Sequence, residues 1–143
     1  MSAESNGFAW CEAMLPKVSR TFAINIAELR GDLHRSIVLA YLWCRIFDTV
    51  EDAESFAVEA KIATLREFQS LFGQDPLDPE RLQKLIGKLD GLDGDPDEVE
   101  LVRNAGRVAG SYNRLPDAYR QAIRPSLVAM AHGMAEFQEL DRS

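Results

Sequence analysis

The stretch SIVLAYLWCRIFDTVEDAE, residues 36–54, decides the fold that we expect for this chain. It is apolar around most of a helical circumference, which is typical of a helix buried in a helical bundle. Its polar residues recur at spacings of four, three and four, so they stack along one helix face. They are Tyr41, Arg45, Asp48 and Asp52, with Glu51 beside them. Such side chains are costly on a buried helix unless they face a cavity or an ion, so the pattern predicts a site for a divalent metal and a diphosphate.

Helical patterns continue through the rest of the chain, so we expect an all-α fold. The expected helices cover residues 9–15, 21–29, 33–52, 56–72, 79–89, 96–115 and 116–140. We expect Pro16 to end the first helix and the Asp32 side chain to cap the third. The turn-rich residues 74–79 and the acidic stretch GLDGDPDE, residues 91–98, are predicted as breaks, the second of them a solvated turn. We find no alternating β-branched runs of convincing length, no repeats and no low-complexity tracts.

The later helical patterns contain three glycines, each of which costs about 1 kcal/mol relative to alanine. They are Gly106, Gly110 and Gly133. Such glycines permit close helix packing or leave room for a ligand, and we favour packing. Met130, Met134 and Phe137 fall on neighbouring turns, where we expect core, although a long apolar substrate would also suit such a surface.

Composition places the chain among ordinary soluble globular proteins. Its 143 residues suit a single domain, with 46% apolar and 27% charged residues. A net charge of -7 and a pI near 4.8 argue against nucleic-acid binding. No signal peptide is visible, and no stretch approaches the ~20 apolar residues of a membrane-spanning helix. Cys11 and Cys44 are predicted to be reduced, partly buried thiols, and we expect a cytoplasmic location.

The carboxylates at the end of the central stretch form the pattern D-x-x-E-D. Asp48, Glu51 and Asp52 lie at positions i, i+3 and i+4, which points them to one side of a helix. Magnesium prefers such hard oxygen ligands together with phosphate oxygens. Arg45 can neutralise a phosphate, and Tyr41 offers a hydroxyl one turn earlier. The alternative is a plain helix end with solvated acids and an Arg45–Asp48 ion pair.

Residues 15–52, LPKVSRTFAINIAELRGDLHRSIVLAYLWCRIFDTVED, resemble the N-terminal part of the squalene/phytoene synthases, the head-to-head prenyl transferases. The SRTFA block, the GDL turn and the Y-x-x-x-R-x-x-D-x-x-E-D helix follow the order and spacing of that family. Residues 114–137 resemble its next helices, and DTVED is closer to the squalene synthase form of the motif. The resemblance implies an isoprenoid synthase-type helical bundle. Residues 1–143 would form the N-terminal half of that bundle, as the N-terminal part of a squalene/phytoene synthase domain.

The resemblance also implies an activity. Two farnesyl diphosphates would condense through presqualene diphosphate to squalene, with Mg2+ and with NADPH as reductant. The implied metal ligands are Asp48, Glu51 and Asp52. The implied catalytic residues are Tyr41 and Arg45. The implied substrate-binding residues are Ser19, Arg20, Phe22, Tyr41 and Arg45, of which Arg20 and Arg45 would also bind the phosphate of the nicotinamide cofactor.

The chain departs from the family pattern in one respect. The second aspartate-rich motif of the family has no match here, so we expect an incomplete site that needs a complementary C-terminal half or self-association. The alternatives are a phytoene or dehydrosqualene synthase, a non-catalytic prenyl-diphosphate-binding subunit, and a plain helical interaction domain. Peripheral membrane contact is expected only because farnesyl chains and squalene are apolar.

Overall fold

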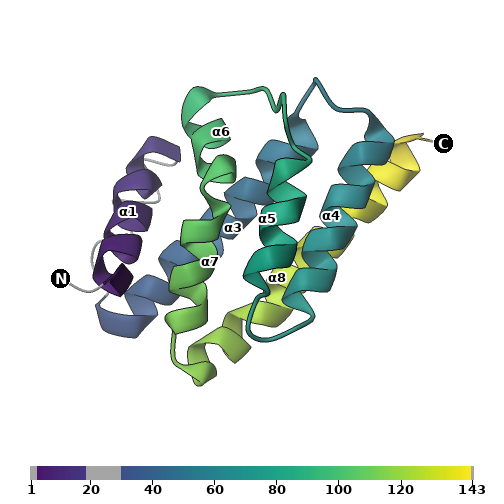
Figure 1. The fold of residues 1–143 in the computed structure, drawn as a ribbon. Helices are drawn as coiled ribbons and strands as arrows, with labels where there is room; N and C mark the ends of the chain where they lie inside the picture. The colour runs from purple at the N-terminus through teal and green to yellow at the C-terminus, as the bar shows by residue number, and fades with distance from the viewer. Residues whose placement is uncertain (1–2, 19–29, 143) are drawn as a thin grey trace.

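The structure, a computed structural model, describes residues 3–18 and 30–142, and within them every regular element is a helix (Figure 1). The helices are α1 Ala3–Val18, α3 Gly31–Asp52, α4 Val58–Phe72, α5 Pro79–Gly87, α6 Pro96–Arg103, α7 Ala105–Arg114 and α8 Asp117–Arg142. The predicted all-α fold is confirmed, whereas the helix expected over residues 21–29 lies outside the described residues. None of the helices in the described part is long and apolar enough to cross a membrane.

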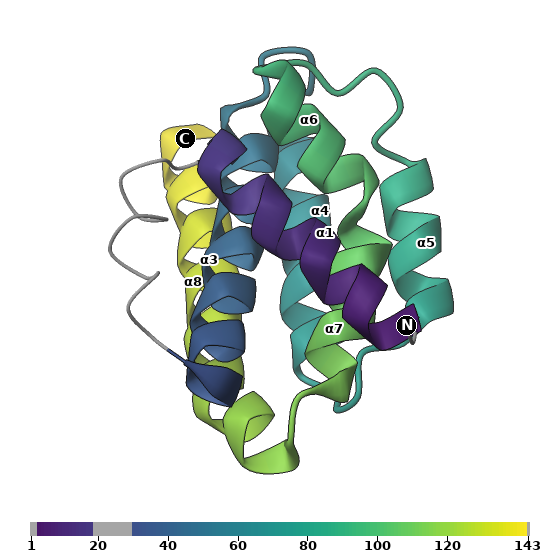
Figure 2. The ribbon, with the colours of Figure 1, turned by 90° about the vertical axis from the view of Figure 1, so that its left-hand side faces the viewer.

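Helix α3 is the centre of the fold, because it contacts α1, α4, α6, α7 and α8. Figure 2 shows α1 lying across α3 and α7 on one side of the molecule. The apolar side of α3, including Leu39, Leu42 and Ile46, is fully buried. The burial predicted from residues 36–54 is therefore confirmed, and the polar stripe occupies the part of the circumference that remains.

Aromatic rings join α3 to the helices packed against it. Trp43 and Phe47 on α3 meet Phe68 and Phe72 on α4, with ring centroids 4.9 Å apart for Trp43–Phe72 and 5.1 Å apart for Phe47–Phe68. Tyr112 on α7 meets Phe72 edge-on at 5.5 Å. All five side chains are buried, and edge-to-face pairs of this kind add about 0.5–1.5 kcal/mol each beyond their area. This cluster fixes α3 relative to α4 and α7.

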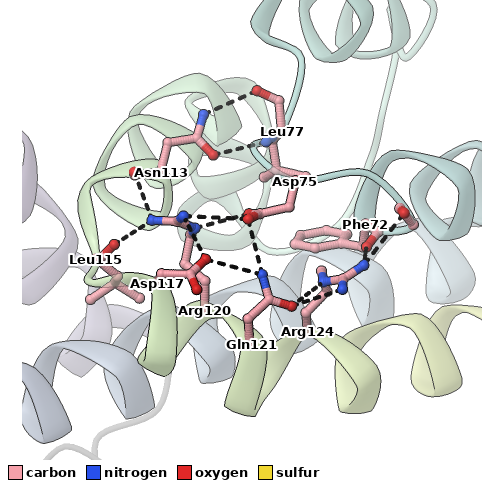
Figure 3. Close-up of polar contacts among 10 residues, drawn as sticks. Phe72, Asp75, Leu77, Asn113, Leu115, Asp117, Arg120, Gln121 and Arg124 are labelled. Carbon is pink, nitrogen blue, oxygen red and sulfur yellow. Dashed lines mark hydrogen bonds and ion pairs between the residues drawn. The ribbon is translucent and has the colours of Figure 1, made fainter.

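A polar clamp holds the loop between α4 and α5 against the junction of α7 and α8 (Figure 3). The Arg120 guanidinium donates to both carboxylate oxygens of Asp75, from Nε at 2.8 Å and from Nη2 at 3.3 Å. Asn113 accepts from the backbone N–H of Leu77 at 2.9 Å and donates to its carbonyl at 3.0 Å. Arg120 also donates to the backbone carbonyl of Leu115. The loop is thus fixed by side chains, with no regular structure of its own.

Three expected helix boundaries are wrong. Helix α1 continues through Pro16 to Val18, because the hydrogen bond that Pro16 cannot donate weakens only the last turn of the helix. Helix α3 begins at Gly31 with Arg30 as N-cap, so Asp32 lies inside the first turn and makes no cap. The helix expected over residues 96–115 breaks at Asn104, whose side-chain amide donates to the Glu100 carbonyl at 2.9 Å and competes with the helical ladder.

The outer face of α8 does not belong to the core. Phe137 is 63% exposed and Met130 38% exposed, so the expectation of core at these positions is wrong, while Met134 packs partly against the core. Within the described part of the chain, no atom lies within 4 Å of a Cβ built on Gly106 or Gly133, so packing does not explain either glycine there. We call the exposed face formed by Met130, Gly133 and Phe137 the α8 stripe.

Candidate functional site

The predicted polar stripe lies along the second half of α3. Tyr41 is partly buried and packs against the hydrophobic core. Arg45 and Asp48 are partly buried one turn apart, and Asp52, the last residue of the helix, is exposed. The predicted residues Ser19, Arg20 and Phe22 lie outside the described residues.

Arg45 binds two carboxylates. Its Nη2 pairs with Glu98 near the start of α6, and its Nη1 lies 3.5 Å from Asp48 Oδ2. Arg45 Nε is buried and has no hydrogen-bond partner among the described residues. Glu98 belongs both to the predicted solvated turn of residues 91–98 and to the predicted helix of residues 96–115. The first expectation is wrong for Glu98, because the residue is partly buried and α6 brings it to the site from 53 residues away. Its one sequence signal was the N-terminal pattern D-P-D-E, in which the Asp95 side chain caps α6.

Asp48 is held in an environment that disfavours its charge. Burial is the main reason that its pKa is raised, and the neighbouring Asp52 carboxylate raises it further. Arg45 opposes both effects without cancelling them. Two aspartates one turn apart, one of them partly desolvated, form a local excess of negative charge that a cation would relieve.

Glu51 points toward a different partner. It lies near Gln138 of α8, a polar side chain that is only 8% exposed and that lowers the pKa of the Glu51 carboxyl. Burial raises the pKa of Glu51, Gln138 lowers it, and Asp52 and Asp48 raise it again. Glu51 therefore links the end of α3 to α8, a contact that the sequence analysis did not find.

Within residues 3–18 and 30–142, no group of three or more acidic, histidine or cysteine side chains is arranged to hold a metal ion. The three predicted carboxylates thus do not converge as a preformed three-ligand cage. Magnesium commonly takes only one or two carboxylates and completes its shell with phosphate oxygens and water. Asp48 and Asp52 are the pair that fits this chemistry, because both lie on the stripe. Burial and, after it, the Asp52 carboxylate raise the pKa of Asp48.

The two cysteines do not contribute chemistry to this site. Cys11 is buried and Cys44 partly buried, and both thiols are free, as predicted. Burial raises the pKa of each to about 11, so neither forms a reactive thiolate near neutral pH.

Fold and site together define an all-helical protein whose central buried helix ends in an arginine–carboxylate site. Residues 15–143 match the squalene/phytoene synthase family. The chain belongs to that family, and the resemblance seen in the sequence is confirmed.

The relatives of this chain are named for different products. The chain is 34% identical over 128 residues to the squalene synthase of Dictyostelium discoideum, covering 90% of this chain and 28% of that protein. It is 34% identical over 137 residues to the Botryococcus squalene synthase of Botryococcus braunii, covering 95% and 27%. The lycopaoctaene synthase of the same organism is 31% identical over 141 residues, covering 99% and 29%. The chain spans less than a third of the length of these relatives.

A solved structure gives the same result for the fold. The complex of TcSQS with the ligand BPH1237 superposes with a TM-score of 0.70 at 31% identity, covering 92% of this chain and 36% of that one. The fold is therefore that of the all-α isoprenoid synthases, and the described helices correspond to part of the larger bundle.

Proposed function

We propose that this chain forms the first diphosphate-binding half of a squalene-synthase-type prenyl transferase site. The proposed substrates are two farnesyl diphosphates, joined head to head through presqualene diphosphate to squalene. The observation that carries the proposal is the Tyr41, Arg45, Asp48 and Asp52 series on a buried central helix of a squalene/phytoene synthase family member. The plain helical interaction domain explains the Arg45–Asp48 pair but gives no reason for an excess of partly desolvated carboxylate.

The chain's own residues fit a magnesium ion and a diphosphate. Asp48 and Asp52 would hold the cation, and Glu51 stays a predicted third ligand whose pKa Gln138 lowers. The bound ion would stabilise the charge that develops on the departing diphosphate. Placing two aspartates without a neutralising lysine or arginine for each is costly for an isolated helix end, and a bound cation would offset that cost.

Arg45 and Tyr41 are the proposed catalytic residues. When the C–O bond to the diphosphate breaks, the leaving group keeps the bonding electrons and an allylic cation remains on the farnesyl chain. The Arg45 guanidinium is placed to stabilise the leaving anion, since its buried Nε is still without a partner among the described residues. Tyr41 is proposed to line the wall beside the cation, where apolar and aromatic surfaces exclude water.

NADPH stays a prediction. Arg20, one of the two residues predicted to bind the cofactor phosphate, lies outside the described residues. We therefore derive no step through the nicotinamide cofactor. Phytoene or dehydrosqualene is the alternative product, because membership of a family that includes squalene and lycopaoctaene synthases does not select one. We propose a cytoplasmic location. Peripheral contact with a membrane is proposed only because the substrate and the product are apolar.

A second candidate function is a non-catalytic subunit that binds prenyl diphosphate. The α8 stripe favours it, because it leaves large apolar side chains in water on a chain that covers 36% of TcSQS. We propose that the α8 stripe docks the complementary C-terminal helices of the same fold. Self-association through the α8 stripe would be seen instead as concentration-dependent dimerisation without added helices.

Calorimetric titration with farnesyl diphosphate, with and without Mg2+, tests the proposal on the 143-residue chain. We expect Mg2+-dependent binding that is lost in Asp48→Asn/Asp52→Asn and kept in Asp90→Asn, a matched change at an exposed loop position. Equal binding by the double variant would refute the assigned ligands. No binding in any form would be expected both of a plain helical interaction domain and of a half-site that needs its complementary helices. Product formation after a C-terminal half is added would exclude the plain domain and separate an enzyme from a binding subunit.

A further inference from the structure

Among the described residues, Glu98 is a carboxylate from another helix that pairs directly with the polar stripe on α3. It lies in the first turn of α6, is partly buried, and forms an ion pair with Arg45 Nη2. We infer that Glu98 is a positioning residue, which holds the Arg45 guanidinium away from Asp48 so that Asp48 stays available to a cation. This inference rests on the proposed function and adds a residue to it.

The geometry of Arg45 supports this role. Its contact with Asp48 is long, 3.5 Å from Nη1 to Oδ2, although the two residues are one turn apart on the same helix and could approach closely. An arginine and an aspartate in contact usually form two parallel hydrogen bonds near 2.8 Å. Glu98 competes for the same guanidinium from α6, so the Arg45–Asp48 pair stays loose.

The backbone around Glu98 is built to keep it in place. The Asp95 side chain accepts from the backbone N–H groups of Asp97 and Glu98, and this cap fixes the first turn of α6. Helix α6 in turn packs against α3, with Leu101 and Val102 buried. Glu98 thus approaches Arg45 from a rigid element, as a residue that orients another must.

Loss of the Glu98 charge has a predictable consequence. Without it, Arg45 would turn onto Asp48 and neutralise one of the two aspartates proposed to hold the metal. Removing a partner that orients a metal ligand typically weakens metal binding by about 10- to 100-fold. If the ion pair served only to dock α6 on α3, the Glu98→Gln variant would be less stable, but the folded variant would keep its metal affinity.

The test uses Mn2+ as a spectroscopic stand-in for Mg2+, titrated by electron paramagnetic resonance into the folded 143-residue chain. We expect Glu98→Gln to weaken Mn2+ binding by about tenfold. The matched control Glu100→Gln removes the same charge from an exposed position on α6 and should leave affinity within about twofold. In an Arg45→Gln background Glu98→Gln should have no further effect, because the two residues act as a unit.

Two results would overturn the inference. One is unchanged Mn2+ affinity in Glu98→Gln. The other is an equal loss in the Arg45→Gln background, which would mean that Glu98 acts by its charge alone. A second measurement needs no metal: the Arg45 Nε–H resonance should shift and exchange faster in Glu98→Gln but not in Glu100→Gln. An unchanged resonance in Glu98→Gln would refute the positioning role. A resonance change in Glu98→Gln, together with no Mn2+ binding by the wild-type chain, would count against the proposed metal site instead.

Discussion

Asp48→Asn is expected to stabilise the fold at neutral pH while removing the proposed metal ligand. The folded state raises the pKa of Asp48 above its ordinary value of 3.8, mainly through burial. A carboxyl with a raised pKa binds its proton more tightly when folded, so stability falls as pH rises through that raised pKa. The penalty is absent at low pH, where the group is protonated in both states. Asparagine carries no charge, so the Asp48→Asn variant does not incur this desolvation penalty.

The size of the effect follows from three contributions. Relief of burial and of repulsion from Asp52 favours the variant, and loss of the 3.5 Å contact with Arg45 opposes it by about 0.2–1 kcal/mol. Arg45 keeps Glu98 as a partner, so no guanidinium is left uncompensated. Because the Asp48 side chain is 35% exposed, solvent screens the gain, and we expect a net stabilisation of about 0.5–1 kcal/mol. That corresponds to roughly 2–4 °C in Tm.

Urea unfolding of wild type and Asp48→Asn between about pH 4 and about pH 7 measures the difference. The advantage of the variant should grow as pH rises, and Asp90→Asn, at an exposed position, should show no such growth. A variant that is less stable than wild type at neutral pH, or a difference that does not vary with pH, would show that Asp48 is an ordinary structural partner of Arg45.

Three further experiments test the packing. Arg120→Met should cost about 2–3 kcal/mol in urea unfolding, because two backbone carbonyls lose the Arg120 donor and Asp75 keeps only Gln121; a loss below about 0.5 would show that the clamp is not structural. Phe72→Ala should cost about 3–5 kcal/mol and Phe137→Ala under about 0.5, since only the first is buried; equal costs would contradict the assigned core. Thiol reagents should label Cys11 and Cys44 slowly at about pH 8 and rapidly after denaturation, because a pKa of about 11 leaves little thiolate; rapid labelling of the folded chain would refute their burial.

The sequence was sufficient for the fold where the signal is local. The apolar face of residues 36–54 repeats at helical spacing over five turns, so both the helix and its burial could be predicted. The break at Asn104 could not, because the flanking residues keep their helical spacing and the Asn104 side-chain hydrogen bond to the Glu100 carbonyl leaves no mark in that spacing. Exposure of Phe137 was also unpredictable, because a periodic pattern shows which residues share a face but not what covers that face.

The candidate site was predictable only in the part that lies on one helix. Arg45 and Asp48 are three residues apart, and the helical repeat alone places them together. Their partners come from elsewhere: Glu98 from α6 and Gln138 from α8. Both occur in stretches whose composition suggests something plainer, an acidic turn and an apolar helix, so pairing them with α3 requires the tertiary structure.

Helix α8 connects the site to the surface that still lacks a partner in the described structure. Gln138 is buried and lowers the pKa of Glu51, while the preceding residue, Phe137, faces outward on the α8 stripe. Because α8 is one continuous helix from Asp117 to Arg142, any rotation that buries Phe137 against further helices also moves Gln138. The direction in which Glu51 points, toward Gln138 or toward a cation beside Asp48 and Asp52, is thereby tied to what covers the α8 stripe. A half-site whose third carboxylate is held by the helix that docks the other half would bind its metal fully only once that half is in place.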